Sequence, residues 1–192
     1  MKKNFSRKLL VLLLLCCFTG ITPAAIQKPD SELRNLLIKA INESNSFKDR
    51  YVAEVWLTDM SSRLGKRIKN AKEKLQFLKT LHHEATRTNL YPEVVLAVIE
   101  VESNFNRFAI SVSGARGMMQ IMPFWLKEIG RPEDDLFNVQ TNLRMGCTIL
   151  RYYLDKEKGD LRKALARYNG SAGKRKYSDK VFNRLSKHWY RQ

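Results

Sequence analysis

Residues 92–103 of this chain read PEVVLAVIEVES. Proline is favourable as the first residue of a helix, and an acidic residue in the first turn interacts well with the helix dipole. Pro92 and Glu93 therefore predict that a helix begins here. The apolar residues that follow predict that it continues to about Ser103.

Glu102 stands at the end of this helix in an unusual place. Three apolar residues precede it at spacings that put them on its own face of the helix: Val95, Val98 and Ile99. Glu93 and Glu100 are seven residues apart and are expected on the opposite, solvated face. Burial beside apolar groups raises the pKa of a carboxyl, which suits a general acid at neutral pH. The competing interpretation is a glutamate that pairs with an arginine at a helix end.

The rest of the chain after residue 30 also reads as helices, because apolar residues recur at spacings of three and four. Expected helices cover residues 31–41, 71–88, 138–153 and 160–168, with Ser31, Asn138 and Asp160 as N-caps, and Ser178 starts a last one. A further helix carries the stripe Val52, Val55, Trp56 and Met60 and ends near Gly65. The predicted fold class is all-α.

Residues 104–122 break the helical periodicity. Asn, Ser and Gly recur there, including Gly114 and Gly117, and this composition predicts turns and a short hairpin beside the helix that carries Glu102. The expected architecture is thus a compact multi-helix domain with one irregular, glycine-marked loop.

Residues 1–25 resemble a secretory signal peptide. A basic start precedes the apolar run of residues 9–18, which is too short to span a bilayer, and small residues follow. Cleavage is expected near residues 24–25, which predicts an exported, periplasmic protein without a stable membrane span. Lipid anchoring at Cys16 or Cys17 is disfavoured, because a bulky residue precedes each.

Signal removal leaves Cys147 as the sole cysteine, expected to be a small buried hydrophobe. The only histidines are His82, His83 and His188, and none is placed to complete a metal site. His82 lies on the apolar side of its helix and is expected to be structural.

The formal charge is +16, and subtracting the four basic residues of the signal segment leaves +12. Such a surface favours polyanions, although scattered lysines and arginines could equally just solvate helix faces. Export favours anionic cell-wall polymer or a membrane surface over nucleic acid. No nucleic-acid recognition motif accompanies the charge.

Three motifs occur in order: VESNFN at 101–106, GARGMMQIMP at 114–123 and ALARYNG at 164–170. Together they resemble the soluble lytic transglycosylases of the lysozyme-like superfamily, relatives of the goose-type lysozymes. The resemblance covers about residues 70–185. It implies a lysozyme-like fold with a catalytic domain at 70–192. A signal peptide at 1–25 and an N-terminal helical extension at 26–69 are expected to precede this domain.

The resemblance also implies roles for individual residues. Glu102 would be the catalytic acid that protonates the glycosidic oxygen. Five residues would bind the substrate: Ser111, Gln120, Met122, Tyr168 and Asn169. In this scheme the first two hydrogen-bond the muramoyl residue, the methionine forms an apolar wall, and the last two close the site around the acid.

The expected mechanism depends on a single carboxylate. Glycosidases normally need two flanking carboxyls. The next acids after Glu102 are expected on a surface connection: Glu128, Glu133, Asp134 and Asp135. The family instead uses the substrate's N-acetyl group and then its 6-hydroxyl. The chain is therefore expected to cleave peptidoglycan at the MurNAc-GlcNAc β-1,4 bond, to leave 1,6-anhydro-MurNAc ends, and to need no metal or cofactor.

Two other functions stay open at this point. One is a hydrolytic goose-type lysozyme, against which the missing second carboxylate weighs. The other is a non-catalytic cell-wall binding module, which would have little reason to hold an acid on an apolar helix face. Residues 31–64 lie outside the resemblance and are a candidate surface for a cell-envelope protein partner, although docking on the catalytic domain is favoured.

Overall fold

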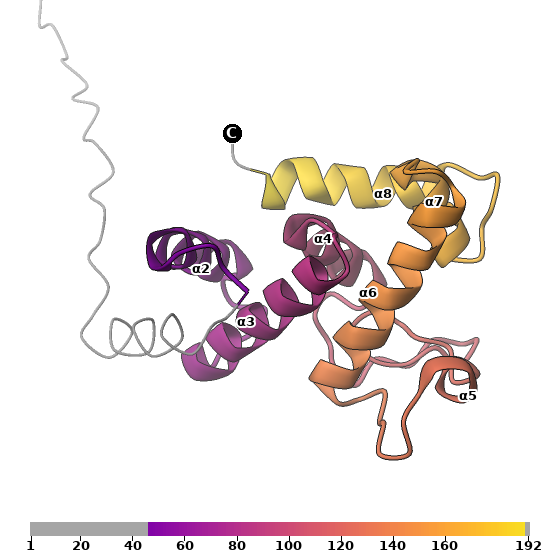
Figure 1. Cartoon of the computed structure of the whole chain (residues 1–192), viewed down its shortest axis with the longest axis horizontal. Helices are drawn as coiled ribbons and strands as arrows, with labels where there is room; N and C mark the ends of the chain where they lie inside the picture. The colour runs from indigo at the N-terminus through magenta and orange to yellow at the C-terminus, as the bar shows by residue number, and fades with distance from the viewer. Residues whose placement is uncertain (1–45, 191–192) are drawn as a thin grey trace, which may run out of the picture.

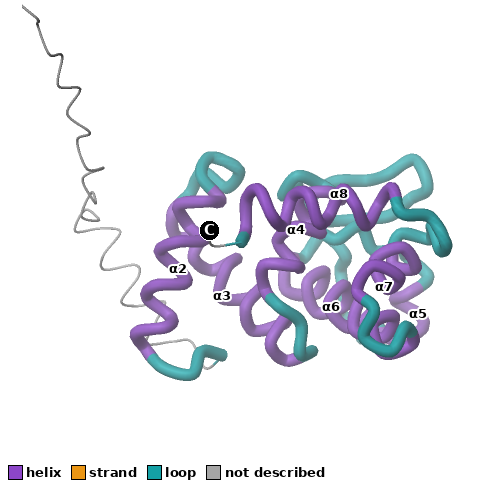
Figure 2. Tube along the Cα trace, turned by 90° about the horizontal axis from the view of Figure 1, so that it is seen from above, coloured by secondary structure: helices purple, strands orange, loops and turns teal. Residues whose placement is uncertain are grey.

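The structure, a computed structural model, describes residues 46–190, and this range is helical (Figures 1 and 2). Its elements are α2 (Arg50–Leu64), α3 (Ala71–Arg87), α4 (Pro92–Glu102), α5 (Trp125–Ile129), α6 (Val139–Lys156), α7 (Leu161–Tyr168), α8 (Lys176–Arg184) and the π-helical turn η1 (Leu185–Trp189). The described range contains no named strand, which confirms the predicted all-α class. None of its helices is long and apolar enough to cross a bilayer.

Helix α4 forms the centre of the core. Residues 94–99 are all buried, since this helix is apolar on every side and needs neighbours all around it. Helices α3 and α8 and the turn η1 pack against it. Figure 1 shows α8 lying above α4, with α6 and α7 on the side away from α2. The end of α4 thereby faces the junction of α7, α8 and the irregular loop.

Two of the predicted N-caps are confirmed. The Asn138 side chain accepts a hydrogen bond of 3.1 Å from the N–H of Thr141, and that of Asp160 accepts one of 3.0 Å from the N–H of Lys163. Each bond satisfies a backbone donor that the first helical turn leaves free. The starts of α6 and α7 are therefore fixed by local sequence.

The apolar stripe predicted for α2 is wrong in part. Val52 and Val55 are 48% and 39% exposed, and Trp56 is half-buried. The buried face instead consists of Ala53, Leu57, Met60 and Leu64. Apolar residues occur on two adjacent faces of this helix, and packing on α3 and η1 selects the face one residue further along. The predicted end at Gly65 is confirmed, since Gly65 is the C-cap.

The last helix begins earlier than predicted. Helix α8 starts at Lys176, and Ser178 lies inside it, fully buried, with its Oγ donating to the carbonyl of Arg175 at 3.0 Å. Ser178 donates to a carbonyl of the preceding turn, whereas an N-cap serine accepts from a backbone N–H of the following turn. The local sequence around a serine does not distinguish these two roles. The helix expected at residues 31–41 lies outside the described residues.

The irregular stretch at 104–122 is held by isolated bridges. Ile110 pairs with Arg116, and Arg116 pairs with Ile121, both antiparallel, so the expected hairpin is confined to single bridges. Gly117 has φ +79°, and a Cβ there would lie 2.3 Å from Nδ2 of Asn142 on α6. Glycine is thus required at Gly117, because the loop must approach α6 this closely.

The interior holds the two groups that were expected to be structural. Cys147 is fully buried, and burial raises the pKa of its thiol. His82 is buried, and its ring stacks on Phe47 with centroids 3.6 Å apart, while its Nδ1 lies 2.9 Å from Oγ of Ser46. Burial lowers the pKa of His82 to about 4, so it stays neutral at physiological pH.

Candidate active site

Glu102 is the last residue of α4, and its carboxyl faces α8. The hydroxyl of Tyr177 donates a hydrogen bond of 2.6 Å to its Oε1. Burial raises the pKa of Glu102 to about 7, and the hydrogen bond from Tyr177 opposes that rise. The raised pKa was predicted from the apolar face of the helix. It means that the carboxyl carries its proton about half of the time at neutral pH.

Tyr177 belongs to this site but was not predicted from the sequence. It lies 75 residues after Glu102, on the buried face of α8 together with Val181, and Leu185 at the start of η1 continues this face. The spacing of four between these three residues is a signal for that buried face. A tyrosine on an apolar stripe also needs a partner for its hydroxyl, which the sequence does not identify.

The loop that follows α4 is clamped onto the helices. The Ser103 hydroxyl donates to the carbonyl of Met118 at 2.8 Å. Buried Asn142 on α6 accepts from the N–H of Met119 at 2.7 Å, and its amide donates to the carbonyls of Arg116 and Leu136 at 3.0 and 2.9 Å. Each polar atom of this buried amide thus has a partner, which fixes the loop beside Glu102.

Ser111 and Gln120 both take part in the loop's own hydrogen bonds. The Oγ of Ser111 accepts from the N–H of Ala115 at 3.0 Å. The Gln120 amide donates to the carbonyls of Ala109 and Gly117 at 3.1 and 2.9 Å. Both side chains are half-buried, and within the described residues nothing donates to the Gln120 Oε1. The loop's own bonds thus use the Ser111 oxygen as an acceptor and the Gln120 nitrogen as a donor.

Tyr168, at the end of α7, bonds to this loop near Glu102. Its hydroxyl donates to the carbonyl of Met119 at 2.7 Å. Burial raises the pKa of Tyr168, and the nearby charge of Glu102 raises it further, so the two side chains lie within electrostatic reach. Asn169 is the exposed C-cap of α7, and Met122 is half-buried at the end of the loop. The substrate-binding roles of these residues stay predictions.

The arrangement therefore consists of one partly protonated carboxyl at a helix end, a tyrosine bonded to it, and a clamped loop with polar edges. Residues 79–190, more than half of the chain, match the family described as the transglycosylase SLT domain. The chain belongs to this family. The resemblance read from the three sequence motifs is thereby confirmed.

Curated relatives in the SLT family share part of the chain. A transglycosylase of Enterobacteria phage PRD1 is 32% identical over 56% of this chain and 39% of the relative. The membrane-bound lytic murein transglycosylase C of Yersinia pestis (strain Pestoides F) is 30% identical over 51% of this chain and 32% of the relative. The chain thus spans about a third of the length of these relatives.

A similar solved structure is an inactive mutant of the lytic transglycosylase Slt from Pseudomonas aeruginosa. It is 23% identical and covers 73% of this chain and 25% of its own, with a TM-score of 0.46.

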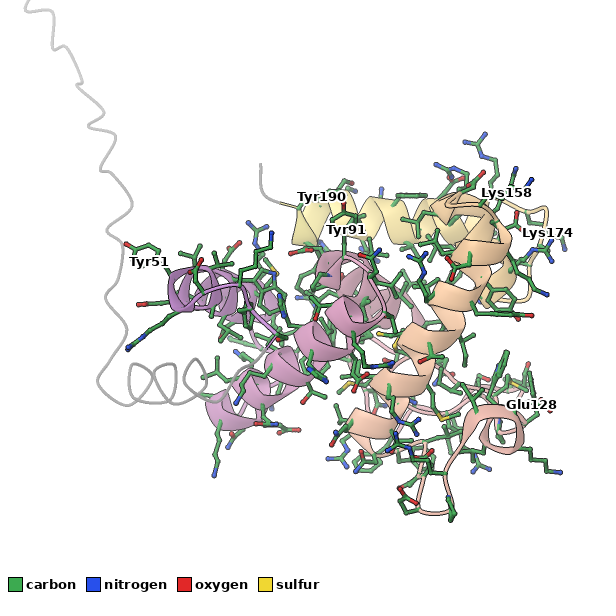
Figure 3. All side chains as sticks on the ribbon, in the orientation of Figure 1. Tyr51, Tyr91, Glu128, Lys158, Lys174 and Tyr190 are labelled. Carbon is green, nitrogen blue, oxygen red and sulfur yellow. The ribbon has the colours of Figure 1, made fainter. Side chains whose placement is uncertain are left out.

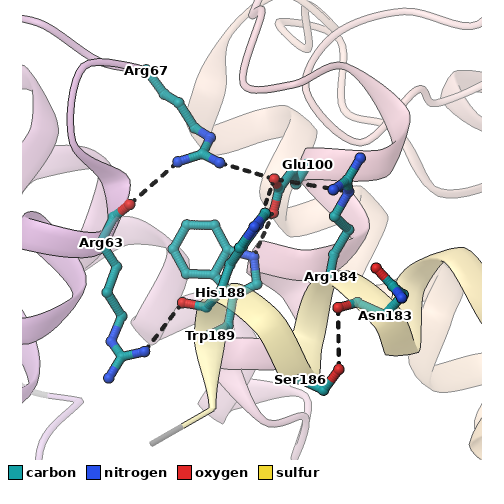
Figure 4. Close-up of polar contacts among 8 residues, drawn as sticks. All are labelled: Arg63, Arg67, Glu100, Asn183, Arg184, Ser186, His188 and Trp189. Atoms are coloured by element: carbon teal, nitrogen blue, oxygen red, sulfur yellow. Dashed lines mark hydrogen bonds and ion pairs between the residues drawn. The ribbon is translucent and has the colours of Figure 1, made fainter.

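Glu100 corrects an expectation, because it is not a surface residue. It is buried, and Arg67 donates to its Oε1 at 2.9 Å, while the Trp189 indole donates to its Oε2 at 2.9 Å. The Nδ1 of His188 lies 2.8 Å from Oε1 (Figure 4). Burial acts to raise the pKa of Glu100, but the hydrogen bonds to His188 and Trp189 and the charge of Arg67 outweigh it and lower the pKa. We call these four residues the Glu100 cluster.

The acids that follow the loop are engaged or exposed. Asp134 was expected on the surface, but it pairs with Arg144 on α6 with only 5% of its side chain exposed. Glu128, Glu133 and Asp135 are exposed, as predicted, and Glu128 projects from α5 (Figure 3). Within residues 46–190, no group of His, Cys, Asp and Glu side chains is arranged to hold a metal ion.

Proposed function

We propose that this chain is a peptidoglycan lytic transglycosylase that cleaves the MurNAc-GlcNAc β-1,4 bond and leaves 1,6-anhydro-MurNAc ends. The observation that carries the proposal is Glu102, a half-buried carboxyl whose pKa is raised to about 7 by burial and which accepts a hydrogen bond from Tyr177. A group with this pKa can donate and take back a proton at neutral pH.

The proposed reaction uses Glu102 twice. Its proton passes to the glycosidic oxygen as the bond from that oxygen to C1 breaks, and the substrate's own N-acetyl oxygen stabilises the positive charge that develops at C1. The Glu102 carboxylate, hydrogen-bonded by Tyr177, then takes the proton from the muramoyl 6-hydroxyl as this oxygen bonds to C1. General acid–base help of this kind contributes about 10²–10⁴-fold.

The surroundings of Glu102 support a mechanism with one carboxylate. Its pKa is raised by burial, and within residues 46–190 no carboxylate contributes to the rise. The nearest acid along the helix, Glu100, is occupied in the Glu100 cluster. A second carboxylate opposite the acid is what retaining and inverting glycosidases use. In the proposed mechanism the substrate's N-acetyl group replaces it.

In this proposal the clamped loop positions the muramoyl residue. Gln120 Oε1 accepts from the N-acetyl N–H, the Ser111 hydroxyl donates to the sugar, and Met122 forms an apolar wall. Tyr168 and Asn169 close the site from the end of α7. The protein would act in the periplasm after removal of residues 1–25, where its basic surface concentrates it on anionic polymer.

Digestion of purified sacculi by the protein, followed by mass analysis of the muropeptides, tests the proposal. The expected products are anhydro-muropeptides, each lighter by one water than the corresponding hydrolysis product. Products with free reducing ends would assign a goose-type hydrolase instead. Binding to sacculi without any cleavage would assign a non-catalytic wall-binding module.

A further inference from the structure

The excess positive charge of the described range is concentrated in its last part. Residues 46–155 contain 16 lysines and arginines and 13 acids, whereas residues 156–190 contain 11 lysines and arginines and three acids. Each of these three acids forms an ion pair within its own segment: Glu157 with Arg167, Asp160 with Lys163, and Asp179 with Arg162. The other eight cations of residues 156–190 therefore have no acid of this segment as a partner.

Four of these cations follow one another along α8 and η1, and we call them the α8 row: Lys176, Lys180, Arg184 and Lys187. Spacings of four and three residues put them on one side of the helix. At 1.5 Å per residue, the row is roughly 16 Å long. All four side chains belong to exposed residues, so the row is a strip of positive charge open to solvent.

The carboxylates near the α8 row are already engaged. Asp179 pairs with Arg162 of α7, and Glu100 is occupied in the Glu100 cluster, with Arg184 at the margin of an ion pair, 3.9 Å away. The three lysines of the row form no ion pair with any residue of 46–190. Their charge is thus available to an external anion.

The α8 row and the proposed catalytic acid lie on different sides of α8. The buried side carries Tyr177 and Val181, and the hydroxyl of Tyr177 bonds to Glu102. The row is on the exposed side of the same helix. A partner that covers the row therefore leaves the bond between Tyr177 and Glu102 in place.

Both ends of α8 extend this face. Figure 3 shows Lys158 and Lys174 projecting outward where α7 leads into α8, and Tyr190 at the opposite end of α8. The Tyr190 residue is 53% exposed, while its backbone carbonyl accepts from Arg63 at 3.1 Å. Tyrosine is enriched where a bilayer meets water, because its ring has an apolar body and a polar tip. A row of cations next to an exposed tyrosine fits a surface that offers both negative charge and apolar material.

We propose that the α8 row and Tyr190 form a binding face for the surface of a bilayer that contains anionic phospholipids. The four cations contact lipid phosphates, and the Tyr190 ring lies at the level of the headgroups. This inference goes beyond the proposed function and does not depend on it. Since the face and Glu102 lie on different sides of α8, membrane binding and cleavage are separable properties of the chain.

Co-sedimentation with lipid vesicles tests the proposal. The protein lacks residues 1–25, so that the apolar run of residues 9–18 cannot insert. It should pellet with vesicles of mixed phosphatidylglycerol and phosphatidylcholine but not with phosphatidylcholine alone, and salt should weaken this binding. Each cation near an anionic bilayer strengthens binding about fivefold, so the double variant Lys176→Gln and Lys180→Gln should lower the partition coefficient roughly 25-fold.

The double variant Lys69→Gln and Lys72→Gln is the matched control. It removes the same charge from exposed positions beside the start of α3 and should bind the mixed vesicles nearly as the wild type does. Equal losses in the two double variants would show that only the net charge matters and would overturn the proposal. Wild-type binding by the row variant would overturn it as well.

Two further measurements separate a bilayer from an anionic polymer. Tyr190→Ser should weaken vesicle binding, whereas Tyr51→Ser, a change at an exposed tyrosine of α2, should not. A Tyr190→Ser protein that binds vesicles like the wild type would refute the choice of a bilayer. If the row substitutions weaken binding to purified sacculi but leave vesicle binding intact, the row belongs to a wall polymer and the proposal is wrong. None of these measurements reads cleavage, so they stand whichever products the enzyme forms.

Discussion

Replacing Glu102 by glutamine should abolish cleavage and, at the same time, stabilise the fold at alkaline pH. The amide fills nearly the same space and can still accept the hydrogen bond from Tyr177. It cannot serve as a strong acid, and it carries no charge to bury. The two effects have the same cause, because the burial that would keep the proposed acid protonated also destabilises its ionised form.

The size of the stabilisation follows from the raised pKa. The folded protein holds the pKa of Glu102 at about 7, against an ordinary value of 4.5. Between these values the folded state binds more protons than the unfolded state, so stability is lost as the pH rises. With about 1.36 kcal/mol for each pH unit, the wild type should lose about 3 kcal/mol from this group by pH 8. Below pH 4.5 the group is protonated in both states and contributes no loss.

Urea unfolding of the wild type and of Glu102→Gln at pH 4 and pH 8 measures this contribution. The stability difference between the two proteins should grow by about 3 kcal/mol from the lower to the higher pH. All other groups titrate in both proteins and cancel. Glu128→Gln, a change at an exposed acid of α5, is the control and should give the same difference at both pH values. If the Glu102→Gln difference is also independent of pH, the carboxyl is not held protonated by burial and the reasoning fails.

Three further changes test the surroundings of the acid. Tyr177→Phe removes the O–H that stabilises the Glu102 carboxylate, so the alkaline limb of the pH profile of kcat/KM should move up by about one pH unit. Tyr168→Phe is the control and should leave that limb in place. Asn142→Leu strips the N–H of Met119 and two carbonyls of their partner and should cost about 2–4 kcal/mol in urea unfolding; a cost below ~1 kcal/mol would contradict the clamp. Glu100→Gln should cost about 3–5 kcal/mol at pH 7. The folded state lowers the pKa of Glu100, so the stability that its carboxylate contributes is present above pH 4.5 and is lost as the pH falls through the folded pKa. An equal cost of the substitution at pH 3 would show that this stability does not come from the negative charge of Glu100.

The apolar surroundings and raised pKa of Glu102 could be predicted from the sequence, because the residues that indicate them are close to it along the chain. Val95, Val98 and Ile99 lie within seven residues of it, and helical periodicity alone puts them on its face. The starts of α6 and α7 were predicted for the same reason, since each N-cap bonds to a residue three positions away. At Glu102 and at both N-caps, the side chain and the residues that determine its environment lie within one or two turns of the same helix.

Glu100 was misplaced because its partners are remote. Its spacing of seven from Glu93 is what a solvated helix face would give, and the residues that bury it come from 33 to 89 positions away. Tyr177 and Asn142 were missed for the same reason, since their bonds span 75 and 23 to 26 residues. Sequence periodicity identifies the face on which a side chain lies, but the partner across the interface depends on the tertiary packing.

The Glu100 cluster also sets an order of events during synthesis. Helix α4 leaves the ribosome 88 residues before His188, and Trp189 follows. At about 5–20 residues per second, α4 waits roughly 4–18 seconds for these partners. During that interval the helix that ends in Glu102 lacks the indole and imidazole that hold its Glu100. A chain that ends before His188 would keep the Arg67 contact to Glu100 but would lack the imidazole and the indole that complete the cluster.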